Sequence, residues 1–63
     1  MFEQYYVIRY VFRYVNSTYY YTKSKRLETE QEANQLKFWL LHNDEIEVVE
    51  CEKSFVEKWI KKA

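Results

Sequence analysis

Residues 4–15 read QYYVIRYVFRYV, and this aromatic-rich run, followed at once by Asn16-Ser17, decides how the rest of the chain is interpreted. From Tyr6 to Tyr14 the even-numbered positions are all apolar or aromatic, whereas the odd-numbered positions mix β-branched residues with Arg9 and Arg13. Alternation with a period of two is typical of a β-strand that has one buried and one wetter face. We therefore expect a long strand whose even face packs in the core.

The residues after this strand are interpreted as the second half of a hairpin. Asn16-Ser17 suits a two-residue turn, which pairs residues whose numbers sum to 33, so that Phe12 faces Tyr21. A shift by one residue would move Tyr19 and Tyr21 off the core side, which disfavours other registers. The second strand is expected to end in the basic run KSKR at residues 23–26.

A helix is predicted from about residue 30 to residue 42. Thr29 with Glu32 three positions later forms a capping box, and acidic residues in the first turn favour the positive end of the helix dipole. Its apolar stripe is broad, because Phe38 and Leu41 widen it beyond the residues that face one sheet. Asn43 is expected to end the helix as a left-handed cap.

Residues 45–52, EIEVVECE, are predicted as a third strand. Its apolar residues change face at Val48-Val49, which indicates either a β-bulge or partial cover on both faces. Ser54 with Glu57 is a second capping box and predicts a short C-terminal helix. The expected fold is thus a single α+β domain over residues 1–63 in the order β-β-α-β-α, with a three-stranded antiparallel sheet, order 2-1-3, on one main helix.

The length and composition of the chain limit how stable the fold can be and which chemistry it can support. A 63-residue chain buries only about 60% of the surface that it exposes when unfolded, so dense aromatic packing or self-association must compensate. One cysteine excludes an internal disulfide, and Cys51 with His42 falls short of a four-ligand zinc site. We expect no metal and no cofactor.

Catalysis is not expected. A nucleophile needs a nearby base and a group that orients this base, and the candidates are Cys51 and His42 alone. Acidic neighbours disfavour the reactive thiolate of Cys51. The chain has no glycine from which to build a phosphate-binding loop. We predict no catalytic residues.

Two kinds of binding remain open. The first is DNA or RNA binding by a basic, aromatic hairpin face, in which arginines and aromatic rings contact phosphates and bases. Two arguments oppose nucleic-acid binding. If strand three lies beside strand one, the arginines of this face are expected to pair with Glu45 or Glu47. An arginine opposite a tyrosine is also an ordinary cross-strand contact. Its candidate residues are Arg9, Arg13, Tyr20, Lys23, Lys25 and Arg26.

The second kind is protein binding, because aromatic and apolar residues exceed the needs of one small core. The C-terminal helix is expected to cover part of this excess. The net charge is −7 over residues 27–52 but +4 before and +3 after them, which suits dimerisation or a basic partner. The candidate residues are Tyr5, Val7, Val11, Phe38, Leu41 and Trp59.

The sequence therefore predicts a non-catalytic protein-binding module with a regulatory or inhibitory role, for an unidentified protein partner and with homodimerisation left open. The alternatives are a nucleic-acid-binding protein and a structural subunit of a larger assembly. The chain lacks Gly and Pro and is rich in Tyr, Lys and Glu, and in this style it resembles accessory proteins of phages and mobile elements in AT-rich bacteria. With no signal peptide and no apolar run of about 20 residues, we expect a cytoplasmic protein without a membrane span.

Overall fold

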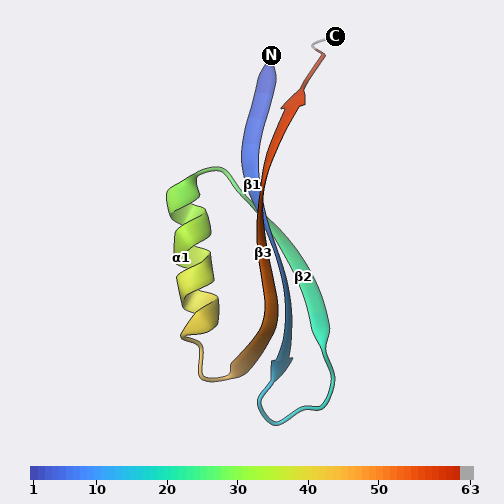
Figure 1. Cartoon of the computed structure of the whole chain (residues 1–63), viewed down its shortest axis with the longest axis vertical. Helices are drawn as coiled ribbons and strands as arrows, with labels where there is room; N and C mark the ends of the chain where they lie inside the picture. The colour runs from blue at the N-terminus through green and yellow to red at the C-terminus, as the bar shows by residue number, and fades with distance from the viewer. Residues whose placement is uncertain (62–63) are drawn as a thin grey trace.

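The computed structural model describes residues 1–61 and folds them into a sheet with one helix on one of its faces (Figure 1). The order of elements is β1 (Phe2–Tyr14), β2 (Tyr21–Leu27), α1 (Glu30–Leu41) and β3 (Ile46–Trp59). The sheet has the strand order β2-β1-β3, and both pairs of neighbours are antiparallel. The α+β class, the strand order and the strand directions agree with the sequence prediction.

The hairpin between β1 and β2 has the predicted register but a wider loop. Phe12 pairs with Tyr21 and Tyr10 with Lys23, as the sum of 33 requires. The ladder ends there, and the turn forms one residue early, where the Ser17 N–H donates to the Tyr14 carbonyl at 2.9 Å. A two-residue hairpin turn needs positive φ angles. No residue from 1 to 61 has one, so the predicted Asn16-Ser17 turn is wrong.

Helix α1 begins as the sequence predicted and ends differently. The Thr29 hydroxyl accepts a hydrogen bond from the Glu32 N–H at 3.2 Å, and the Glu32 carboxylate accepts one from the Glu28 N–H at 3.3 Å. At the other end His42 is the cap, with φ −108°, and its N–H donates to the Phe38 carbonyl at 3.1 Å. Asn43 is not a left-handed cap; its side-chain oxygen instead accepts the Glu45 N–H at 2.9 Å.

The predicted C-terminal helix is wrong, because β3 continues as one strand of 14 residues to Trp59. The order of the described elements is therefore β-β-α-β. A capping box contributes only about 1 kcal/mol, and a short helix is marginal without packing. By continuing as a strand, the segment supplies hydrogen-bond partners to the first half of β1, with Phe55 opposite Tyr6 and Trp59 opposite Phe2.

Strand β3 contains the bulge that was one of the two predicted alternatives. Glu50 pairs with Val11 and Val48 with Phe12, so Val49 is an extra residue in β3. This extra residue restores the alternation, because it lets Val48 and Cys51 both pack against the core under α1.

The core lies between α1 and the even face of β1, and within residues 1–61 the buried apolar side chains are Ile8, Phe12, Leu27, Ala33 and Leu40. A helix of 12 residues is only about 18 Å long, whereas a strand of 13 residues spans about 43 Å. Strands β1 and β3 therefore project past the beginning of α1 as a two-stranded ribbon, at the upper end of the molecule in Figure 1. The molecule measures 49 × 22 × 15 Å.

Candidate protein-binding surfaces

The sheet face opposite α1 carries arginines that are paired with carboxylates. Arg13 Nη2 lies 2.5 Å from Glu47 Oε2, and Arg9 Nη1 lies 3.3 Å from Glu50 Oε1. The expectation that an arginine of this face meets Glu47 is confirmed for Arg13. Glu50 as the partner of Arg9 was missed, because the bulge at Val49 decides which side of β3 Glu50 occupies.

Arg26, at the end of β2, is also engaged. It forms ion pairs with Glu3 and, at 3.0 Å, with Glu28, and its guanidinium lies 3.9 Å from the centre of the Tyr5 ring. The hydrogen bond to Glu3, with a further contribution from Glu28, raises the pKa of Arg26 above its ordinary value. A nucleic acid would have to compete with these carboxylates for the guanidinium.

The sheet separates the residues of the nucleic-acid hypothesis. Lys23 and Lys25 pair with Tyr10 and Ile8 and therefore lie on the face that α1 covers, whereas Arg9 and Arg13 lie on the other face. Tyr20 is in the loop between β1 and β2, outside the ladder, and is exposed. The structure thus does not gather these six side chains into one basic surface.

The residues of the protein-binding hypothesis fall into three places. Tyr5, Val7 and Val11 are half-buried on the face opposite α1, among the ion pairs. Phe38 and Leu41 are exposed on α1, at 64% and 60%. Trp59 lies at the far end of the ribbon.

The second half of α1 and the residue after it carry an exposed apolar group, the helix patch, formed by Phe38, Trp39, Leu41 and His42. The Phe38 ring stacks on the His42 ring, with 4.0 Å between centroids, and His42 Nδ1 lies 2.9 Å from the Phe38 carbonyl oxygen. Trp39, of which 56% is exposed, was not among the candidate residues. The signal available was that Leu36 and Leu40 already fill the stripe facing the sheet.

Acidic residues adjoin the helix patch. A hollow of ≈ 530 Å³ runs from the patch to the turn after α1 and is lined by Phe38, Trp39, His42, Asn43, Asp44 and Glu45. Both carboxylates belong to exposed residues. This part of the surface therefore combines aromatic rings with negative charge.

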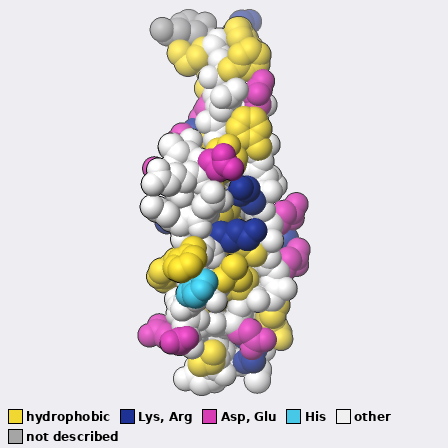
Figure 2. Space-filling model, turned by 60° about the vertical axis from the view of Figure 1, so that its left-hand side comes forward, with side chains coloured by type: hydrophobic (Ala, Val, Ile, Leu, Met, Phe, Trp, Pro, Cys, Tyr) yellow, Lys and Arg dark blue, Asp and Glu magenta, His cyan; other side chains and the backbone are white. Residues whose placement is uncertain are grey.

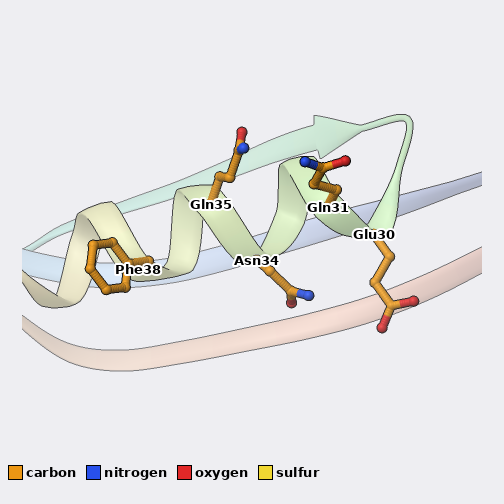
Figure 3. Close-up of a pocket in the computed structure, with 5 residues that line it drawn as sticks. All are labelled: Glu30, Gln31, Asn34, Gln35 and Phe38. Atoms are coloured by element: carbon orange, nitrogen blue, oxygen red, sulfur yellow. The ribbon is translucent and has the colours of Figure 1, made fainter.

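The first half of α1 has a different, polar surface. A hollow of ≈ 630 Å³ lies over it, lined by Glu30, Gln31, Asn34, Gln35 and Phe38. Figure 3 shows that Glu30 and Asn34 point toward β3, whereas Gln31 and Gln35 point away from it. Because side chains of one helix line it alone, this hollow is an open surface and encloses no site for chemistry.

The ribbon carries an aromatic surface that sequence reasoning missed, because residues 54–60 were assigned to a helix. On the face that continues from under α1, three cross-strand pairs follow one another: Phe2 with Trp59, Gln4 with Glu57, and Tyr6 with Phe55. The rings are 4.9 Å apart in the first pair and 5.2 Å in the third, and Gln4 Nε2 donates to Glu57 at 3.2 Å. We call these six residues the ribbon face.

The ribbon face is exposed except at Tyr6, which is half-buried and packs against the core. Phe2, Phe55 and Trp59 have exposed fractions of 60%, 54% and 63%. Figure 2 shows hydrophobic side chains at the surface of the part that projects beyond α1. The alternation of Phe55, Glu57 and Trp59 was the available signal for a strand here.

The groups considered for catalysis have other roles. Cys51 is half-buried opposite Tyr10 and packs against the core, and His42 caps α1. Within residues 1–61 no three His, Cys, Asp or Glu side chains gather so as to hold a metal ion.

In the same part of the chain, no helix has the length and apolar character needed to cross a membrane. Comparison with protein-family models, curated proteins and solved structures finds no match.

Proposed function

We propose that this chain is a non-catalytic, regulatory protein-binding module and that the helix patch contacts its partner. One observation carries the proposal. Phe38, Trp39 and Leu41 lie within four consecutive residues, each more than half exposed, and no other element of the described chain covers them.

The helix patch has the composition of an interface anchor. Contiguous exposed apolar surface is unusual on a small monomer and marks interaction sites, and aromatic residues supply much of the binding energy at protein interfaces. Stacking on His42 restricts the side chain of Phe38, so this side chain loses less conformational entropy when a partner binds. A preformed anchor of this kind suits a small binding module.

The charge beside the patch indicates the kind of partner. Asp44 and Glu45 line the same hollow as Phe38 and Trp39. A complementary surface would be apolar at its centre and basic at its rim. The acidic rim should mainly raise the association rate and make it sensitive to salt.

The proposal is tested by affinity capture from cells that encode the chain. The immobilised wild-type protein is compared with a Phe38→Ser/Trp39→Ser variant and with Gln31→Ala/Gln35→Ala, a matched control on the polar half of the same helix. We expect one protein to be captured by the wild type and the control, lost by the patch variant, and weakened by salt. Equal capture of the same protein by all three would overturn the assignment of the helix patch.

Nucleic-acid binding is the second candidate, and one observation favours it. Tyr19, Tyr20 and Tyr21 are exposed at 73%, 60% and 46% and lie next to Lys23, an arrangement on which single-stranded bases could stack. The test is retention on heparin and binding of a fluorescent single-stranded oligonucleotide at low salt. Binding that a Tyr19→Ala/Tyr20→Ala variant loses would support this candidate, and no retention would reject it.

A further inference from the structure

The ribbon face lacks the second layer that covers the rest of the same sheet face. Lys53, which pairs with Ile8, reaches the beginning of α1, where its Nζ lies 3.9 Å from Glu30 and 3.5 Å from the Asn34 side chain. Tyr6 is half-buried and packs against the core, and Lys53 Nζ lies 5.8 Å from the centre of its ring. Phe55 and the pairs Gln4–Glu57 and Phe2–Trp59 follow along the strands and are exposed. The layer formed by α1 thus ends at Tyr6.

We propose that a second copy of this chain supplies the missing layer, with the two ribbon faces packed against each other about a two-fold axis through the Gln4–Glu57 pair. In this dimer the ribbon of one copy covers the ribbon face of the other, next to the helix α1 that covers the rest of that sheet face. Three observations favour a second copy as the occupant: the symmetric order of the pairs in the ribbon face, the surface area of the chain, and the opposite charges at the end of the ribbon and at the beginning of α1.

The order of the pairs is symmetric about the centre of the ribbon face. Aromatic pairs stand on either side of one polar pair, so the two-fold axis places Phe2 and Trp59 of each copy over Tyr6 and Phe55 of the other. Rings packed in this way bury apolar surface and form offset or edge-on contacts. Gln4 of one copy then lies over Gln4 of the other, and Glu57 lies over Glu57.

The single chain exposes more surface than a compact monomer of its mass, as expected for a chain with an uncovered face. A compact monomer of this mass would expose about 4,450 Å², whereas the chain exposes 5118 Å², roughly 670 Å² more. Its radius of gyration is 14.3 Å, against about 10.6 Å for a compact domain of the same length. A standard interface buries about 800 Å² on each partner, which is close to this excess.

Charge favours the antiparallel arrangement. Near its end the ribbon carries the exposed Lys61, and Glu28, Glu30 and Glu32 lie at or just before the beginning of α1. Lys58 pairs with Glu3 and therefore lies on the other face of the sheet. With the axis at the Gln4–Glu57 pair, the end of each ribbon reaches the beginning of α1 in the other copy. Opposite charges therefore meet twice, once at each end of the interface.

This inference is independent of the helix patch. The patch lies on the other half of α1, away from the ribbon, and stays exposed in the dimer. A dimer would present two helix patches, which raises the avidity for a partner with two sites.

The experiment is sedimentation equilibrium of the whole chain from low micromolar to submillimolar concentration. We expect a monomer–dimer equilibrium that Phe2→Ser/Trp59→Ser weakens by about 100-fold or more, because two aromatic anchors are lost. Phe38→Ser/Leu41→Ser, on the helix patch, should leave it unchanged. A monomer at every concentration, or equal dimerisation of both variants, would overturn the proposal.

Two further variants test the axis without removing apolar surface. Glu57→Gln should tighten the dimer several-fold, because it removes two like charges that face each other across the axis; no tightening would overturn this axis. In a Cys51→Ser background, a short bis-maleimide should join two chains through Gln4→Cys but not through Lys23→Cys. Cross-linking at Lys23→Cys alone would overturn the axis. Circular dichroism confirms that each variant is folded.

Discussion

Arg13 and Glu47 lie directly opposite each other on β1 and β3, and their side chains meet at 2.5 Å. The other terminal nitrogen of the same guanidinium, Nη1, donates to the Ser17 carbonyl at 3.1 Å and to the Val15 carbonyl at 3.4 Å. Arg13 therefore joins the start of β3 to the loop that leads into β2. Its role is to close this end of the sheet, which leaves the guanidinium little capacity for a partner.

Replacing Arg13 with alanine should lower the free energy of unfolding by about 1–2 kcal/mol, because one ion pair and its bonds to loop carbonyls are lost together. Arg9→Ala is the matched control: its pair with Glu50 is exposed on both sides and should contribute no more than about 0.5 kcal/mol. Urea unfolding followed by tyrosine and tryptophan fluorescence measures both. Equal losses for the two variants would contradict the closing role of Arg13.

Leu40 and Leu41 are consecutive leucines with opposite environments, since their exposed fractions are 1% and 60%. Leu40→Ala should cost about 3 kcal/mol, a large share of the stability of so small a domain. Leu41→Ala should change the stability by less than about 0.5 kcal/mol. Thermal unfolding compares the two, and similar midpoints would show that α1 does not present Leu40 to the sheet.

The parts of the fold that could be predicted are those that one local signal determines. The alternation of apolar and polar residues in β1 predicted the hairpin register, and the capping box of Thr29 with Glu32 predicted the start of α1. The C-terminal strand could not be predicted in this way, because residues 54–60 carry two signals at once. Ser54 with Glu57 indicates a helix, whereas Phe55, Glu57 and Trp59 alternate as in a strand. Pairing with distant residues of β1 decided between them.

Of the two candidate surfaces, the helix patch could be predicted in part and the ribbon face could not. Phe38 and Leu41 were expected outside the core because the stripe on α1 is too broad for one sheet, and both are exposed. The ribbon face was not predictable, because it exists only if residue 55 lies opposite residue 6 and residue 59 opposite residue 2. Cross-strand neighbours of this kind depend on a register that no residue inside the segment specifies.

Thr29→Ala should lower the free energy of unfolding by about 1 kcal/mol, because it leaves the Glu32 N–H without its side-chain acceptor at the start of α1. Thr29→Ser should recover most of the loss, since serine provides the same hydroxyl. Thr18→Ala, in the exposed loop between β1 and β2, controls for the loss of a threonine as such. If Thr29→Ser were as unstable as Thr29→Ala, the hydroxyl would not be the cause.

Deletion of Val49 should be tolerated, because it removes the extra residue of the bulge and leaves every other pair of β1 with β3 in register. Val48 would remain opposite Phe12 and Glu50 opposite Val11, so the alternation of buried and exposed residues would continue without interruption. We expect a folded protein with a loss below about 1 kcal/mol, mainly from the changed twist of the sheet.

Deletion of Val56 is the matched control, because no spare residue stands next to it. The deletion shifts the strand by one residue, and this shift can be taken up in two ways. In the first, residues 57–59 change faces, which removes Trp59 from the ribbon face. In the second, residues 49–55 change faces, which exposes Cys51. We expect this variant to lose more stability than the Val49 deletion and, in the first case, to dimerise less. The opposite order of stability, measured by urea unfolding, would show that Val49 is required in β3.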